Sequence, residues 1–218
     1  MAESLTKKKA RARSIIRLLE RAHPDAKIAL ECSNPLELLV ATILAAQCTD
    51  ERVNQVTRTL FKKYTTAEDY ARADLATLER EIHSTGFYKA KARALTGMAK
   101  ELVARHGGQV PRTLGELTAL PGVGRKTANV VLGNAYGQPA IAVDTHVFRV
   151  SQRLGLAKSD DPEKVHEQLC QVVPRAKWTH FSHLLTTHGR RQCMARTPAC
   201  PSCPVRALCP WPGKRAFA

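Results

Sequence analysis

Four cysteines lie close together near the end of the 218-residue chain, at Cys193, Cys200, Cys203 and Cys209. Their spacing, C-x6-C-x2-C-x5-C, is short enough for all four thiolates to reach one metal centre. Zinc and an iron–sulfur cluster both accept four cysteines, so the ligand type leaves the metal open. The spacing favours a cluster, because zinc sites usually have two short cysteine knuckles and this segment has one.

The other three of the seven cysteines are Cys32, Cys48 and Cys170. They lie among apolar residues of helical pattern, so we expect them to be buried small hydrophobic residues. An odd total also argues against a framework made only of disulfides.

A glycine-containing turn at residues 120–126 joins two segments of helical pattern. Gly122 and Gly124 allow a tight turn and a close approach of the backbone to a ligand. The N–H groups of Val123, Gly124 and Arg125 would then open the next helix, where a phosphate is favoured. The spacing is not that of a nucleotide P-loop. The alternatives are a plain interhelical turn and, beside a strongly basic composition, a clamp for the DNA backbone.

Lys126 lies in the first turn of that next helix, where the helix dipole disfavours a cation. It is expected either to pair with a phosphate or to be held neutral as a nucleophile. An ordinary lysine has a pKa near 10.4 and is neutral in only about one molecule in 2,500 at pH 7. A nucleophilic role therefore requires an environment that changes this balance.

Asp144 is the carboxylate that could work with Lys126. It follows the apolar residues 140–143 and precedes a helical pattern, so it could be an N-cap and nothing more. It is also eighteen residues from the lysine, so it could lie across a cleft from it. The residues alone leave both roles open.

Helical periodicity runs through almost the whole chain, and the predicted class is all-α. The one extended stretch, residues 140–143, is too short to build a sheet. Helix starts are predicted at Asn34-Pro35 with Glu37 as a capping-box acid, at Asp50, at Asp74, at Thr113 with Glu116, and at Asp161-Pro162. Helix ends are predicted at Gly86, Gly107 and Gly137.

The composition is strongly basic, with 34 Lys and Arg against 19 Asp and Glu, a net charge of +15. Hydrophobic residues make up 44%, so this is a folded protein, and nucleic acid is the first expected partner. Eleven of the fifteen net charges lie in residues 1–27 and 188–218. We expect no membrane span and no secretory signal peptide.

Together, the turn at 120–126, the Val143-Asp144-Thr145-His146 segment, the Lys126–Asp144 interval and the terminal cysteine spacing resemble the endonuclease III family. These are bifunctional DNA glycosylases and abasic-site lyases of the helix-hairpin-helix glycosylase superfamily. The similarity extends over most of the chain, from about Leu36 to Cys209. Each motif is moderately specific, and their ordered combination is strongly so.

The resemblance implies two helical domains with DNA and the active site in a groove between them. One is a six-helix barrel, residues 28–138, that contains the helix-hairpin-helix at 113–136. The other joins residues 1–27 to 139–218 and carries a [4Fe-4S] cluster on the loop 193–209. The four C-terminal cysteines would be the cluster ligands.

The resemblance also assigns roles to residues. Lys126 is the catalytic amine and Asp144 the essential carboxylate. Gln47 would fill the hole left by the extruded base, and Phe87 would wedge beside the unpaired partner; the alternatives are a helix-end amide and a core ring. Apart from the resemblance, the residues themselves predict further DNA contacts: from the hairpin at Gly122, Val123, Gly124, Arg125 and Thr127, and from the cations around the cysteines at Arg190, Arg191 and Arg196.

The implied reaction is base excision repair of double-stranded DNA containing oxidised pyrimidines or abasic sites. Lys126 would displace the flipped base, form a Schiff base and cut the strand by β-elimination. Cys48 and Thr118 differ from many relatives near the expected lesion pocket, so the range of lesions stays open. We expect a bacterial-type, cytoplasmic, nucleoid-associated monomer.

The sequence leaves two alternatives open. An adenine glycosylase of the same superfamily typically lacks the lysine found here at Lys126 and has an additional C-terminal domain. A non-catalytic DNA-binding protein would use Lys126 only to neutralise phosphate, with zinc on the four cysteines.

Overall fold

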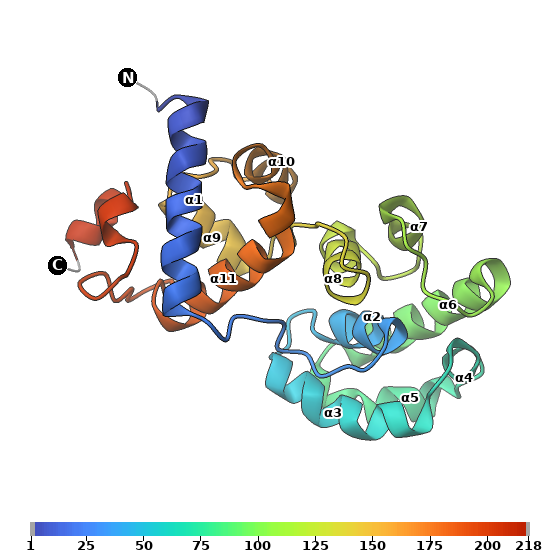
Figure 1. Ribbon diagram of the computed structural model, residues 1–218. Helices are drawn as coiled ribbons and strands as arrows, with labels where there is room; N and C mark the ends of the chain where they lie inside the picture. The colour runs from blue at the N-terminus through green and yellow to red at the C-terminus, as the bar shows by residue number, and fades with distance from the viewer. Residues whose placement is uncertain (1–2, 217–218) are drawn as a thin grey trace. The chain divides into compact units, whose positions relative to one another are not determined.

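The computed structural model describes residues 3–216, and within that range it consists of helices, turns and irregular segments without a strand (Figure 1). The prediction of an all-α protein is confirmed. The chain forms two compact units. The central unit is Ala29–Gln138, and the terminal unit joins Met1–Ile28 to Pro139–Ala218.

The central unit is built around a helix that is apolar on all sides. Its elements are α2 (Pro35–Leu44), α3 (Asp50–Lys63), α4 (Ala67–Ala71), α5 (Leu75–Glu81), η1 (His83–Thr85), α6 (Tyr88–His106), α7 (Leu114–Thr118) and α8 (Arg125–Ala135). Every residue of α2 from Leu38 to Leu44 is buried, and α2 packs against α3, α6 and α8. A helix buried on all faces is the natural centre of such a unit.

Most of the predicted helix starts are confirmed, because a cap is a local contact. Asn34 accepts from the N–H of Glu37 at 2.9 Å, and Asp74 accepts from the N–H of Thr77 at 2.9 Å. Thr113 and Asp161 cap α7 and α10 in the same way.

Two details of the predicted starts are wrong by one residue. The N-cap of α3 is Thr49, whose hydroxyl accepts from the N–H of Arg52, and Asp50 is the first helical residue. The carboxylate of Glu37 accepts from the N–H of Ser33 at 2.6 Å, one residue before the N-cap that a capping box would use.

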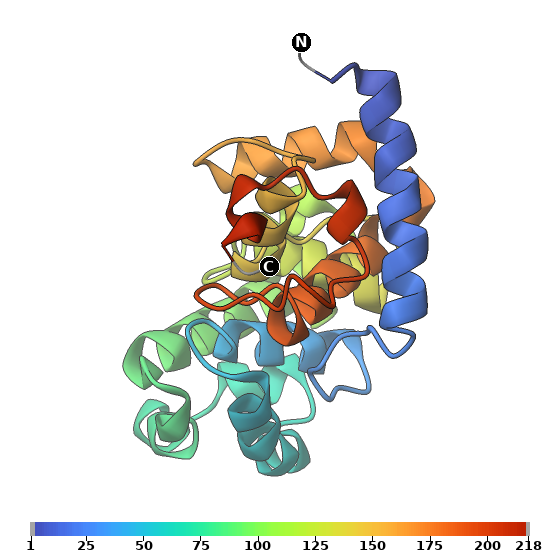
Figure 2. The same cartoon turned by 90° about the vertical axis from the view of Figure 1, so that its left-hand side faces the viewer.

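The terminal unit has its own core. Its elements are α1 (Leu5–Ala22), α9 (Thr145–Arg153), α10 (Pro162–Val172), η2 (Arg175–Lys177), α11 (Trp178–Arg191), η3 (Arg206–Leu208) and η4 (Pro212–Arg215). α1 packs against α10 and α11, and α11 also packs against α9 (Figures 1 and 2). Ile15, Leu19, Val150, Phe181 and Leu184 are all fully buried in this core.

The cysteine-containing segment is anchored to this core rather than projecting from it. Cys193, Cys203, Leu208 and Cys209 pack against the core as partly buried residues. The Arg11 guanidinium of α1 donates to the carbonyl oxygen of Leu208 at 3.3 Å. The two ends of the chain are therefore fastened together within one unit.

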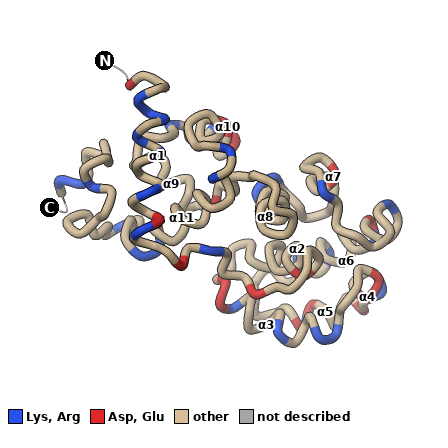
Figure 3. Tube along the Cα trace, viewed as in Figure 1, with Lys and Arg blue, Asp and Glu red and all other residues tan. Residues whose placement is uncertain are grey.

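Charge differs between the two units. The terminal unit has 20 Lys and Arg against 8 Asp and Glu, or +12, whereas the central unit has 14 against 11, or +3. Blue stretches follow α1 and the C-terminal segment in Figure 3. Among residues 3–216, no helix combines the length and apolar character that crossing a bilayer requires.

Candidate active site and cysteine-lined cavity

The turn between α7 and α8 has the geometry expected of a phosphate-binding hairpin. Gly122 has φ +75°, and a Cβ there would come within 2.7 Å of the Cβ of Ala94. Only glycine meets both constraints. Gly124 is the N-cap of α8 and has no side chain to cap the helix, and N–H groups in the first turn of a helix favour an anion.

The side chains after this turn differ in exposure. Val123 is 5% exposed and anchors the turn in the core, whereas Arg125 and Lys126 are exposed and Thr127 is half-buried. The amine of Lys126 thus lies at the beginning of α8, directly after the hairpin amides. A phosphate held by those amides would lie near this amine.

Gln47 and Phe87 lie on two turns of the central unit. Gln47 follows α2 and has φ +53°, and Phe87 precedes α6 and has φ +48°. Within residues 3–216 these two are the non-glycine residues in the left-handed region, which side chains with a Cβ rarely adopt. Both are exposed, and Phe87 keeps 65% of its surface in solvent. A core position for Phe87 is therefore wrong.

Asp144 is an N-cap, and it has a second hydrogen-bond partner. Its Oδ1 accepts from the N–H of Val147 at 2.6 Å, which caps α9. Its Oδ2 accepts from the hydroxyl of Thr186 on α11 at 3.0 Å. These two contacts fix the plane of the carboxylate.

Two histidines beside Asp144 are held in the neutral form. Burial lowers the pKa of His183 to about 4, and the Asp144 carboxylate opposes this shift. Burial also lowers the pKa of His146, again against the effect of Asp144. Arg149 contacts Nδ1 of His146 at 3.1 Å and donates to the carbonyl oxygen of Cys193. Hydrogen bonds through Arg149 therefore link the segment around Asp144 to the cysteine-containing loop.

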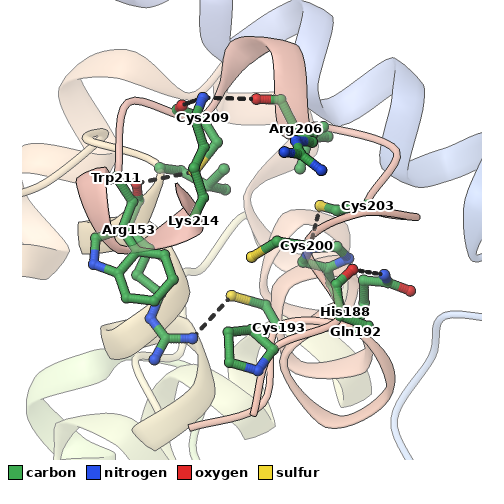
Figure 4. A pocket seen from close by; sticks show the side chains of 14 residues that line it. Arg153, His188, Gln192, Cys193, Cys200, Cys203, Arg206, Cys209, Trp211 and Lys214 are labelled. Atoms are coloured by element: carbon green, nitrogen blue, oxygen red, sulfur yellow. Dashed lines mark hydrogen bonds between the residues drawn. The ribbon is translucent and has the colours of Figure 1, made fainter. Parts of the chain in front are cut away.

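The four C-terminal cysteines line a single cavity in the terminal unit (Figure 4). Its empty volume, including space open to solvent, is about 380 Å³. The sulfurs of Cys193, Cys200 and Cys203 point toward the common space, with Arg153 and Trp211 on one side and His188 on the other. Within residues 3–216, no three His, Cys, Asp or Glu side chains lie close enough together to hold a single metal ion.

The surroundings of these cysteines fit a cationic or metal–sulfur group. Burial raises the pKa of the thiols of Cys203 and Cys209, and the neighbouring cysteines raise both further. Several thiolates in one cavity therefore need bound positive charge. The guanidinium of Arg153 donates to Sγ of Cys193 at 3.3 Å, and Nε2 of His188 lies 3.7 Å from Sγ of Cys203.

The remaining cysteines only partly match the prediction that they are buried. Cys32 is exposed and lies in the segment before α2, so the prediction is wrong for it. Cys48 lies in the turn after α2, and Cys170 lies on α10; both are half-buried. Burial raises the pKa of Cys170 to about 11, which makes its thiol inert at neutral pH.

The three arginines around the cysteine loop are exposed, but they differ in their contacts. Arg191 forms a two-fold ion pair with Asp25, at 2.9 and 2.6 Å. Arg190 is the residue before Arg191, which ends α11, and Arg196 lies on the loop between the first two cysteines.

Some residues that shape the site were not predicted from the sequence. Thr186 gave no signal, because its partner Asp144 is 42 residues away. Arg149 and Arg153 lie four residues apart on one face of a predicted helix, and that spacing could have indicated a shared role. Arg153 donates to the carbonyl oxygens of Met194 and Ala195 and lies over the ring of Trp211.

The all-helical fold and the glycine-containing turn between α7 and α8 indicate one class of helical proteins. Comparison with known proteins identifies that class. Residues 40–175 match the model of the HhH-GPD superfamily base excision DNA repair proteins. The chain is 46% identical over 211 residues to endonuclease III of Synechocystis sp., covering 96% of each. It is 49% identical over 187 residues to endonuclease III of Bacillus subtilis, covering 85% of each.

Two solved structures are also similar. One is a non-covalent endonuclease III–DNA complex, with a TM-score of 0.91, 45% identity and coverage of 96% of this chain and 99% of that one. The other is a trapped endonuclease III–DNA covalent intermediate, with a TM-score of 0.91, 46% identity and coverage of 95% and 98%. This chain therefore belongs to the endonuclease III family of the HhH-GPD superfamily.

Proposed function

We propose that this protein is a base excision repair enzyme with DNA glycosylase and abasic-site lyase activity. The observation that carries the proposal is the position of Lys126, an exposed amine in the first turn of α8, after a glycine turn whose amides can hold a phosphate. Among similar structures is a covalent endonuclease III–DNA intermediate, the kind of species an amine nucleophile forms.

The reaction begins when the damaged base is flipped out of the duplex. The unprotonated amine of Lys126 attacks C1′ of the sugar, and the base leaves with the electron pair of the glycosidic bond and takes up a proton. The sugar ring opens to a Schiff base between C1′ and the lysine. Loss of a C2′ proton then expels the 3′ phosphate, which breaks the strand on that side.

Asp144 stabilises positive charge on the sugar and assists proton transfer around the attacking amine. Its two oxygens are held by the N–H of Val147 and the hydroxyl of Thr186, so the carboxylate is oriented before DNA binds. Orientation of this kind lowers the cost of reaching the reacting geometry.

DNA binding involves backbone contacts and inserted side chains. The amides of Gly122, Val123, Gly124 and Arg125, with Thr127, hold phosphates on one side of the lesion. Gln47 fills the space left by the flipped base, and Phe87 wedges beside the unpaired partner; both are exposed on tight turns, as insertion requires. The negatively charged DNA backbone is attracted by the positive charges of Arg190, Arg191 and Arg196.

A [4Fe-4S] cluster is the group that we assign to Cys193, Cys200, Cys203 and Cys209, because these four residues line one cavity. When bound, it supplies a fixed cross-link of the C-terminal segment and a one-electron redox centre. Metal and sulfide analysis of anaerobically purified protein tests the assignment. Iron with sulfide supports it, and zinc without either contradicts it.

The substrates we propose are oxidised pyrimidines and abasic sites in double-stranded DNA, acted on by a monomer in the bacterial cytoplasm. A panel of thymine glycol, an abasic site and 8-oxoguanine in matched duplexes tests the substrate class. Faster release of the purine lesion than of thymine glycol would contradict it. Size-exclusion chromatography with light scattering measures the molar mass in solution and so tests whether the protein is a monomer.

Borohydride trapping tests the chemistry. The wild-type protein is expected to form a covalent adduct with duplex DNA containing thymine glycol or an abasic site. Lys126→Ala is expected to form none, because no amine is left to make the Schiff base. Lys62→Ala, which removes an exposed lysine of α3, is the matched control and should trap like the wild type. No adduct with wild-type protein would overturn the proposal.

A further inference from the structure

Lys91 on α6 is a buried lysine that the reaction above does not use. Its side chain is part of the core of the central unit, with 5% of its surface exposed. Its ammonium donates to the carbonyl oxygen of Leu44 at 2.7 Å and to that of Thr85 at 2.8 Å. Burial lowers its pKa, which shows that the position is costly for a cation.

The two carbonyl groups belong to the ends of two elements. Leu44 is the last residue of α2, and Thr85 is the last residue of η1. Carbonyls at the end of a helix have no partner within it and carry partial negative charge, so a buried ammonium is a favourable partner for them. Lys91 therefore connects two chain segments that are about forty residues apart in sequence.

Each of these ends leads directly to one of the two strained turns. Gln47, with φ +53°, is three residues after Leu44. Phe87, with φ +48°, is two residues after Thr85. The backbone N–H of Lys91 also donates to the carbonyl of Phe87 at 3.0 Å, in the first turn of α6. One residue thus holds the bases of both turns.

We propose that Lys91 is a positioning residue that keeps Gln47 and Phe87 at a fixed separation, so that both side chains enter the DNA duplex together. This inference rests on the proposed function and extends it to the architecture of the inserting turns. Without Lys91, two buried carbonyls lose their partner and the turns move independently. The order needed for insertion must then be created during DNA binding.

Lys91→Met tests this, because methionine keeps the length and apolar stem of the side chain and removes the ammonium. The measurement is the single-turnover rate of borohydride trapping on one DNA strand that contains an abasic site. The same strand is used single-stranded and annealed to its complement as a duplex. Both forms need Lys126, but only the duplex has to be opened. We expect trapping to be roughly tenfold slower or worse on the duplex and nearly unchanged on the single strand.

Lys100→Met removes an exposed lysine from the same helix and is the matched control, with no expected change on either form. Equal losses for Lys91→Met on both forms, or no loss on the duplex, would overturn the positioning role. Failure of the proposed function is a different result, since the wild-type protein would then trap neither form.

A second experiment keeps the inference testable if Lys91→Met does not fold. Gln47→Ala, Phe87→Ala and the double variant change exposed side chains, and their affinities for a duplex with a reduced abasic site form a mutant cycle. Concerted insertion predicts that the double variant loses less affinity than the product of the single losses. Losses that simply multiply would show independent turns and would overturn the proposal.

Discussion

The central and terminal units differ in how charge and chemistry are distributed. The central unit, at +3, contains Lys126, which is the proposed nucleophile, the hairpin, and the two turns that we propose to insert into DNA. The terminal unit, at +12, contains Asp144, the cysteine-lined cavity and the four histidines whose pKa is lowered by burial: His23, His146, His183 and His188. Most of the net charge is therefore not in the unit that holds Lys126.

Net charge and the position of the proposed catalytic groups are therefore separate properties of the fold. Charge acts over about 8–10 Å at physiological salt and needs no precise geometry, so it can lie on α1 and the C-terminal loop. Covalent chemistry requires fixed atoms: the proposed nucleophile lies in the first turn of α8, and the two side chains proposed to insert lie on tight turns beside packed helices. The carboxylate of Asp144 is the exception, since it is a precisely held group in the highly charged unit.

Among substitutions in the terminal unit, the largest effect is expected for Asp144→Asn, which tests that exception. Asparagine is as good an N-cap as aspartate, so α9 and the thermal unfolding midpoint should not change. The trapping rate at saturating DNA should fall by about 10²- to 10⁴-fold, because the negative charge is lost. Asp161→Asn, the same change at the N-cap of α10, is the control. An unchanged rate would show that Asp144 has no catalytic role and that the terminal unit does not contribute it to the reaction.

Thr186→Val is expected to have the next largest effect. It keeps the shape of the side chain and removes the hydroxyl that donates to Asp144 at 3.0 Å. A hydrogen bond to a charged group is worth about 1.5–3 kcal/mol, so we expect at least a roughly tenfold lower trapping rate with unchanged DNA affinity. Thr187→Val, on the same helix, should leave the rate unchanged. A change in affinity without a change in rate would contradict a role in orienting the carboxylate.

Acidification should destabilise the terminal unit in particular. Folding lowers the pKa of His183 from its usual 6.5 to about 4, so below pH 6.5 the unfolded chain binds a proton that the folded one does not. Stability therefore falls as the pH drops from 6.5 toward 4, by about 1–2 kcal/mol at pH 5 for this residue. Chemical unfolding at pH 7 and pH 5 measures the difference.

His183→Gln should reduce this pH dependence, whereas His83→Gln, an exposed histidine of the central unit, should not. If hydrogen exchange shows that the central unit opens first at pH 5, the proposed difference in acid sensitivity between the units is wrong.

The smallest effect is expected for Arg190→Gln or Arg191→Gln. Each should weaken DNA binding a few-fold and reduce the slope of log affinity against log salt by about 0.9 for each lost phosphate contact. Trapping at saturating DNA should not change. Arg80→Gln, an exposed arginine of the central unit, is the control. Loss of trapping at saturating DNA would show that these residues take part in the chemistry.

Much of the fold could be predicted because it depends on contacts between close neighbours in sequence. The caps at Asn34, Asp74, Thr113 and Asp144 join residues three apart, so residue type and spacing were enough. The errors at the start of α3 and at Glu37 are of one residue, because neighbouring polar side chains compete for the same amides.

The sequence could not indicate residues whose role depends on distant partners. Lys91 contacts Leu44 across 47 residues, and Thr186 contacts Asp144 across 42. No local pattern marks such pairs, because they depend on how separate helices pack. Cys32 was mispredicted for the same reason: whether a thiol is buried depends on packing, and it lies in an irregular segment that leaves it exposed.

In the proposed reaction one amine, that of Lys126, forms the covalent bond to the sugar. Peptide mapping of the borohydride-trapped adduct by mass spectrometry tests it directly, without any substitution. We expect the sugar-derived mass on the peptide that contains Lys126, and on that lysine. The same mass on the N-terminal amine, or on another lysine, would contradict it.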